Sequence, residues 1–115
     1  MREILQNLVR TQGVRGALVA SPDGFVAAAE TPDDVDDEAV AAAAAVMQSA
    51  CAASASRLGK GELSRCVLAG ESGGAILTEA GGALLVVLLD ANANQGLVSV
   101  EVKSATAEVA KHTAF

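Results

Sequence analysis

The residues best suited to nucleophilic or metal chemistry are two cysteines, Cys51 and Cys66, and one histidine, His112. A zinc site needs about four such ligands, and these cysteines show neither a CxxC spacing nor a histidine cluster. A catalytic Ser or Cys needs a base beside it, whereas His112 lies in the last turn, where chain ends fray. Both cysteines lie in apolar stretches, which raise a thiol's pKa and lower its reactivity. We therefore predict no enzyme activity, no metal and no cofactor.

Two further patterns could bind charged partners. The glycine-rich residues 70–74 lack the GxxxxGK[ST] form of a phosphate loop, so we interpret them as a turn between strands. The acidic run at residues 33–38 could be a binding patch, but carboxylates also favour the positive end of a helix dipole, and we prefer a helix start. Lys and Arg number 8 against 14 Asp and Glu, giving a net charge of -6. Without a cluster of cations, we expect no nucleic-acid binding.

Hydrophobic spacing and turn residues predict the elements that carry these groups. A first helix covers residues 2–11, and a Ser-Pro-Asp-Gly turn at residues 21–24 joins the two strands of a hairpin. A long helix begins after Thr31-Pro32, capped by Thr31 or Asp36, and runs to about Leu58 before Gly59. Five strands are expected in all, at residues 16–20, 25–29, 62–68, 75–78 and 83–89.

The segment after the last strand allows two interpretations. Val98, Val100 and Val102 alternate as in a strand, whereas Val98, Val102, Ala105 and Val109 keep a helical spacing over a longer span. We favour a helix, capped by an asparagine at 92 or 94. The strand at residues 83–89 is apolar on both faces and should be central. The prediction is one α/β (α+β) domain over residues 1–115, with a five-stranded antiparallel sheet, helices on its faces and the order α-β-β-α-β-β-β-α.

The composition favours an oligomer. The chain has 115 residues, is 51% hydrophobic and contains no Trp or Tyr. Its core must therefore be built from small side chains, each of which buries little area at about 25 cal/mol per Å². Such a domain gains from burying more surface against a partner. The N-terminal segment lacks a signal-peptide core, and two reduced, buried thiols fit a cytoplasmic protein.

The long helix strengthens that expectation. Its larger side chains form one stripe that should face the sheet: Val40, Ala44, Met47, Cys51 and Leu58. The opposite face is also uncharged, and it comprises Ala42, Val46, Ser49, Ala53 and Ser56. A helix without a charged face is buried on more than one side, in a membrane, beneath another helix of the same chain, or against its twin in a two-fold dimer. We favour the dimer and expect no membrane insertion.

Three stretches resemble the Roadblock family, which is named for a dynein light chain and includes the bacterial MglB-type proteins. They are GVRGALVASPDGFV at residues 13–26, RLGKGEL at the end of the long helix, and ALLVVLLDANANQGLV at residues 83–98. The resemblance implies a profilin-like fold and a homodimer whose long helices pair and whose middle strands, about residues 62–68, join the two sheets. It adds three residues to the expected interface: Leu63, Arg65 and Val67.

The same resemblance implies a role beside Ras-like small GTPases, as activator, scaffold or subunit of a regulatory complex. Arg57 and Lys60, with Arg65, are candidate polar contacts to such a partner. The alternative is a structural adaptor that binds a sensor kinase or a motor-associated protein. A small-ligand sensor ranks last, because an alanine-filled core shows little sign of a polar pocket.

Overall fold

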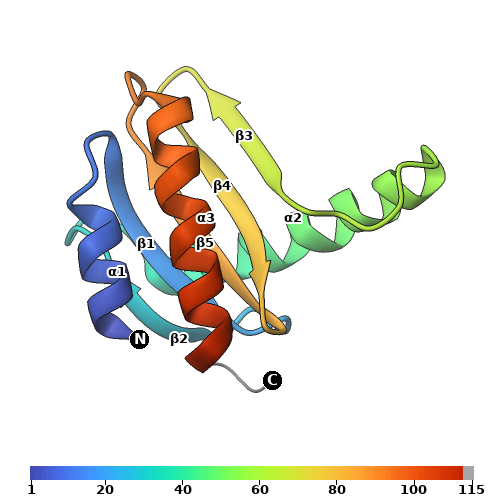
Figure 1. Cartoon of the computed structure of the whole chain (residues 1–115), viewed down its shortest axis with the longest axis horizontal. Coiled ribbons are helices and arrows are strands. Elements are labelled where there is room, and N and C mark those ends of the chain that lie inside the picture. The colour runs from blue at the N-terminus through green and yellow to red at the C-terminus, as the bar shows by residue number, and fades with distance from the viewer. Residues whose placement is uncertain (113–115) are drawn as a thin grey trace.

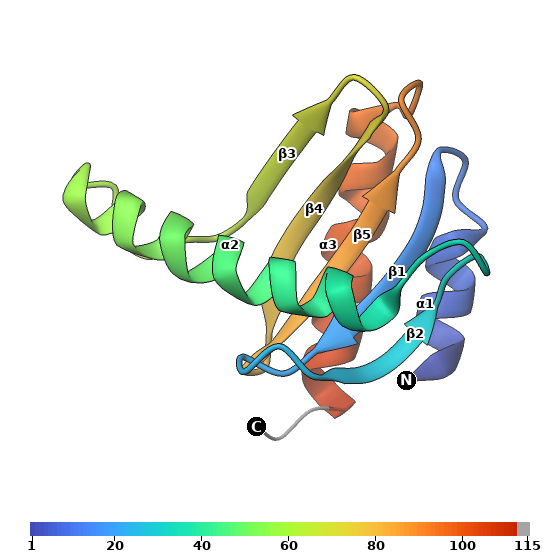
Figure 2. The same ribbon diagram turned by 180° about the vertical axis from the view of Figure 1, so that it is seen from behind.

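The computed structural model describes residues 1–112 and has three layers, with an antiparallel sheet between helices (Figure 1). The elements follow the predicted order: α1 (Arg2–Val9), β1 (Val14–Ala20), β2 (Val26–Glu30), α2 (Asp37–Arg57), β3 (Cys66–Gly70), β4 (Gly73–Ala80), β5 (Ala83–Leu89) and α3 (Gln95–His112). Helices α1 and α3 cover one face of the sheet, and α2 crosses the other (Figure 2).

The sheet has the strand order β2-β1-β5-β4-β3, with every neighbouring pair antiparallel. Strand β5 is therefore central, as its apolar sequence predicts. Its Val86 lies between Leu18 of β1 and Leu77 of β4. A central strand is covered on both faces, which explains why β5 lacks the polar alternation of a half-exposed strand.

Alternation along the strands divides the core between the two faces. The core between the sheet and helices α1 and α3 includes Leu5, Val19, Leu85, Val98 and Val102, all fully buried. The smaller core between the sheet and α2 includes Leu18, Ala41, Ala44, Leu77 and Val86. Alanines at the contact surface of α2 let the helix approach the sheet closely.

Side-chain hydrogen bonds at the starts of α2 and α3 show which of the candidate residues cap these helices. The Asp36 carboxylate accepts a hydrogen bond from the Ala39 amide at 3.2 Å, so Asp36 caps α2 and the hydroxyl of Thr31 bonds to Asp37 instead. At α3 the Asn94 side chain accepts from the Leu97 amide at 3.1 Å. The segment after β5 is thus a helix, as its longer periodicity predicts.

Removing the α2 cap gives a first test. Asp36→Ala leaves the Ala39 amide without its side-chain acceptor and is expected to lower the free energy of unfolding by about 1 kcal/mol. Asp33→Ala removes an exposed carboxylate that lies outside the helix, and should change stability by less than about 0.5 kcal/mol. Urea unfolding followed by circular dichroism measures both, and equal losses would contradict the capping role.

Candidate functional site

The outer face of α2 is uncovered. Of its residues, Val46 is 71% exposed, and the other four, Ala42, Ser49, Ala53 and Ser56, are exposed as well. On the inner face Ala41 and Ala44 pack against the sheet. Helices α1 and α3 lie on the opposite side of the sheet. The alternative in which another helix of the same chain covers the outer face of α2 is therefore wrong for the described residues.

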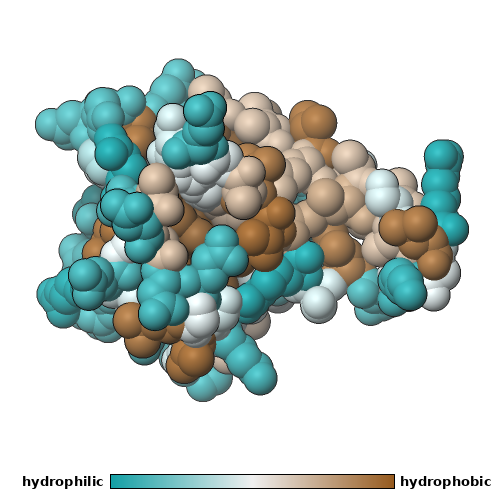
Figure 3. All heavy atoms as spheres, turned by 90° about the horizontal axis from the view of Figure 1, so that it is seen from above, coloured by the Kyte–Doolittle hydropathy of each residue, from teal (hydrophilic) through white to brown (hydrophobic). Residues whose placement is uncertain are grey.

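The second half of α2 projects past the edge of the sheet as an arm (Figures 1 and 2). Val40, Met47 and Cys51 pack against the sheet as predicted, but Leu58 does not, being 73% exposed. The spacing predicted that Leu58 lies on the sheet-facing side of the helix. The helix extends beyond the edge of the sheet, so no strand lies under Leu58. Figure 3 shows weakly hydrophobic and hydrophobic atoms along the arm and hydrophilic atoms at its tip.

Helix α2 is long and apolar enough to cross a membrane, judged by length and composition alone. One contact argues for another role: its first turns pack Ala41 and Ala44 against a folded sheet. Serine and alanine provide too little hydrophobicity to favour insertion over this packing.

The edge of the sheet beside the arm is also open. Strand β3 is bonded to β4 on one side only, and its Val67 and Leu68 are 50% and 53% exposed. An exposed apolar edge strand is a template for pairing with another strand. The face of α2 and the edge of β3 are the candidate functional surface, and we name them the α2–β3 surface.

The strand at this edge begins later than the sequence predicts, at Cys66 rather than near residue 62. Residues 62–65 connect the tip of the arm to the sheet and carry no strand hydrogen bonds. Leu63 is half-buried against the core beneath α2, whereas the Arg65 guanidinium donates to the Ser99 hydroxyl of α3 at 3.1 Å. Of the three residues expected at the strand interface, only Val67 lies within β3.

Arg57 and Lys60 lie at the tip of the arm, where the left-handed Gly59 (φ 70°) ends the helix. Both cations are exposed. Among residues 1–112 neither has an ion-pair partner, because the three salt bridges join Arg2 to Glu30, Arg15 to Asp34 and Lys111 to Glu108. These two side chains are therefore free to contact a partner.

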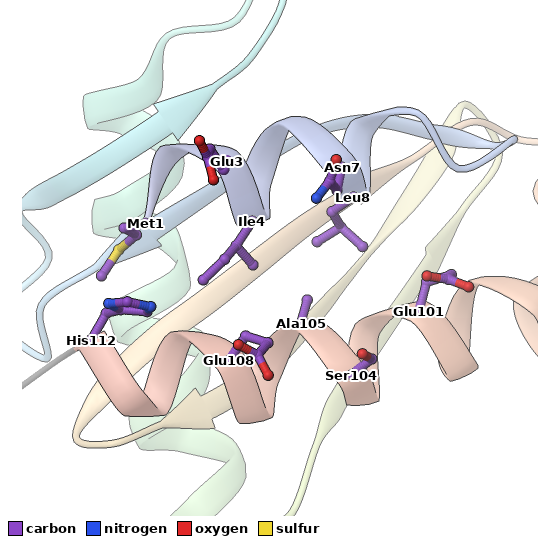
Figure 4. A pocket seen from close by; sticks show the side chains of 10 residues that line it. All are labelled: Met1, Glu3, Ile4, Asn7, Leu8, Glu101, Ser104, Ala105, Glu108 and His112. Carbon is purple, nitrogen blue, oxygen red and sulfur yellow. The ribbon is translucent and has the colours of Figure 1, made fainter.

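A groove of about 600 Å³ separates α1 from α3 (Figure 4). Ile4 and Leu8 point from α1 towards α3, Ala105 points back, and Met1 and His112 close one end. Ser104, Glu108 and His112 follow one another along α3 but make no hydrogen bonds to each other in the described chain; Glu108 instead pairs with Lys111. The groove therefore lacks the linked nucleophile and base of a hydrolytic site. The described residues also contain no cluster of three potential metal ligands.

Comparison with known proteins identifies the family of this chain. The sequence model of the Roadblock/LC7 domain matches residues 1–89, more than three-quarters of the chain. The chain belongs to the Roadblock/LC7 family. This Roadblock/LC7 domain is 36% identical over 106 residues to the uncharacterized protein MJ1340 of Methanocaldococcus jannaschii, covering 92% of this chain and 93% of that protein.

Solved structures agree with the family. The gliding protein MglB from Thermus thermophilus superposes with a TM-score of 0.86 at 32% identity, over 95% of this chain and 84% of that one. An MglB with a tetrameric arrangement gives 0.87 at the same identity and coverage. Profilin IB of Acanthamoeba castellanii, at 19% identity and a TM-score of 0.66, covering 96% of this chain and 97% of its own, shows the fold alone. The predicted profilin-like fold is confirmed, and Roadblock/LC7 domains are regulatory or adaptor modules rather than typical enzymes.

The two cysteines of this Roadblock/LC7 domain meet between α2 and β3. Both are free thiols; Cys66 is buried as predicted, whereas Cys51 is only half-buried. Burial raises the pKa of the Cys66 thiol to about 12, and a hydrogen bond to Cys51 and repulsion from the Cys51 thiolate, where it forms, add to the effect. Since the thiolate is the reactive form, we expect Cys66 to react slowly near neutral pH.

Alkylation mapped by mass spectrometry tests this property. With a pKa of about 12, about one Cys66 in ten thousand is a thiolate at pH 8, and the fraction rises about tenfold per pH unit. We expect iodoacetamide to modify Cys66 far more slowly in the folded protein than in urea. The raised pKa also makes the Cys66 contribution to stability complete below pH 9 and progressively lost as pH rises from 9 towards 12, because the unfolded thiol ionises first. Equal alkylation rates in the folded and unfolded protein would contradict the raised pKa.

Proposed function

We propose that this Roadblock/LC7 domain is a non-catalytic homodimeric regulator or scaffold for a Ras-like small GTPase, acting in the cytoplasm. The observation that carries the proposal is the outer face of α2, which has no charged residue from Ala39 to Ser56 and is left exposed by its own chain. A soluble surface helix ordinarily carries charge on its outer face. An uncharged one is explained by a second copy that covers it.

In the proposed dimer, two α2 helices pack against each other about a two-fold axis and two β3 edges pair across it. Alanine and serine on the outer face permit close approach of the helices, and Val67 adds apolar contact at the strand edge. The interface residues we propose are Ala42, Val46, Ser49, Ala53, Ser56, Leu63, Arg65 and Val67. A two-fold interface is self-complementary, so each of these positions is used twice.

The GTPase role is supported by family membership and by the likeness to MglB at 32% identity. In a dimer the two arm tips would present Arg57 and Lys60 at separate places, to one or two partner molecules. Stimulation of GTP hydrolysis is one form this regulation could take, and recruitment without stimulation is another. A structural adaptor for a sensor kinase or motor-associated protein is the alternative, since the same surfaces would serve it.

Hydrolysis of GTP by a Ras-like GTPase of the same organism, measured with and without this protein, separates these roles. A stimulated rate identifies an activator, and nucleotide-dependent pull-down without stimulation identifies a scaffold. The double variant Arg57→Ala/Lys60→Ala should weaken the interaction about tenfold or more, as expected for lost charge-assisted contacts. Arg10→Ala/Lys111→Ala removes the same charge from exposed positions away from the arm and should leave the interaction intact. Absence of binding to every such GTPase would favour the adaptor.

A further inference from the structure

A second, smaller groove lies where the chain enters β3, on the face of the sheet that carries α3. It has a volume of about 320 Å³ and is lined by Ser64, Arg65, Thr78, Lys103 and Thr106. Its lining residues carry two cations and three hydroxyl groups, and the aliphatic parts of these side chains make up most of its exposed surface. It is separate from the outer face of α2, which lies across the sheet.

The cations converge because of helical spacing and one side-chain hydrogen bond. Ser99, Lys103 and Thr106 are four and three residues apart, so they share the flank of α3 that faces β3 and β4. Ser99 accepts from the Arg65 guanidinium at 3.1 Å and so holds Arg65 over that flank, beside Lys103. Arginine retains further N–H donors after this one bond, because its guanidinium has five.

The hydroxyl groups of Thr78 and Thr106 at the base of the groove already have hydrogen-bond partners. Thr106 donates to the Val102 carbonyl at 2.7 Å, which uses its only hydroxyl hydrogen. The 2.8 Å bond between the two threonine hydroxyls must then be donated by Thr78, which is only 4% exposed. The hydrogen-bond donors left for a ligand are therefore those of Arg65, Lys103 and the exposed Ser64.

The positive charge of this groove is not neutralised within the described chain. Neither Arg65 nor Lys103 takes part in any of the salt bridges among residues 1–112. The carboxylates of α3, Glu101 and Glu108, line the groove against α1 instead, on the other flank of the helix. In a chain of net charge -6, two neighbouring cations without a carboxylate favour an anion from outside.

We propose that this groove binds a phosphate group, either free phosphate or the phosphate of a phosphorylated side chain on a partner. The forked guanidinium of Arg65 matches the oxygens of a tetrahedral oxyanion, and the Lys103 ammonium supplies a second charge. A volume of about 320 Å³ is at the lower end for ligand sites, which suits one oxyanion better than a whole nucleotide. The proposal does not rest on the GTPase role, but it uses Arg65, which also belongs to the proposed dimer interface, because the groove adjoins the start of β3.

Titration of the ¹⁵N-labelled protein with inorganic phosphate, followed by NMR at constant ionic strength, tests the proposal. The amide signals of residues 64, 65, 78, 103 and 106 should shift and saturate with a dissociation constant of about 1 mM, typical of a small open site. A short phosphoserine peptide provides a second arm. Tighter binding of the peptide identifies a phosphorylated partner as the source, and equal binding identifies the free ion.

Two variants make the test specific. Arg65→Gln and Lys103→Gln should each weaken phosphate binding about tenfold, the effect of losing one charge-assisted hydrogen bond. Arg10→Gln/Lys111→Gln removes two exposed cations elsewhere and should leave phosphate binding unchanged. The proposal is overturned if phosphate produces no saturable shifts at residues 64, 65, 78, 103 and 106, if this control variant weakens binding equally, or if acetate binds as tightly as phosphate.

Discussion

Val46→Glu is expected to convert the proposed dimer into monomers. Val46 lies at the middle of the outer face of α2 and is 71% exposed in the single chain, so the change should cost the monomer little stability. In the dimer the two-fold axis would bring two new carboxylates into an apolar interface. An uncompensated buried charge costs several kcal/mol, which corresponds to at least a hundredfold weaker association at about 1.4 kcal/mol per tenfold.

The matched control is Val100→Glu, which places the same charge on α3 at a valine that is 66% exposed. Light scattering coupled to size exclusion at micromolar concentration should give the dimer mass for the unchanged protein and for Val100→Glu, and the monomer mass for Val46→Glu. One MglB structure shows a tetrameric arrangement, so the measured mass must also separate two copies from four. A monomeric unchanged protein, or an undiminished mass for Val46→Glu, would rule out the α2 interface.

Leu85→Ala is expected to cause the largest loss of stability. Leu85 is fully buried in the central strand, paired with Val19 on one side and Thr78 on the other, beneath α1 and α3. Truncation removes buried apolar surface and leaves a cavity that the surrounding strands cannot close. The expected cost is about 2–5 kcal/mol, a large share of the stability of a small domain.

Leu97→Ala is the control for that experiment, because Leu97 is already 49% exposed at the start of α3. It removes the same atoms and should lower the unfolding free energy by much less. Urea unfolding at one fixed protein concentration compares the two variants without a contribution from changed oligomer populations. Equal losses would show that the sheet interior is less tightly packed than its burial indicates.

The elements that could be predicted are those whose signals are local. The central position of β5 follows from a run of residues that is apolar on both faces, and α3 follows from a helical spacing that persists to Val109. The hairpin of β1 and β2 turns where expected, with Gly24 in the left-handed region at φ 89°. Each of these depends on neighbours within a few residues, which the sequence displays directly.

The predictions that were wrong concern features that depend on contacts between residues far apart in the chain. Strand β3 starts at Cys66, opposite Leu77, although β4 continues to Ala80. Residues 62–65 lead back from the tip of the arm instead, and the Arg65 side chain is held by Ser99 of α3, a contact that the local sequence does not show. Leu58 has the spacing of a core residue, but the sheet ends before the helix does. The sequence did not predict the groove shared by Lys103, Thr78 and Thr106. The one available signal was the spacing of Ser99, Lys103 and Thr106, which places them on the same flank of a helix.

The sequence by itself determined that the long helix has no charged face, because side-chain type and a period of 3.6 residues are local properties. It therefore predicts that this helix is covered on two sides. Only the tertiary structure decided that the chain covers one side, since α1 and α3 pack on the far face of the sheet. Likewise, only the fold brings Arg65 beside Lys103, because a contact between residues so far apart in the chain depends on the register of β3 and β4 and the packing of α3 on the sheet.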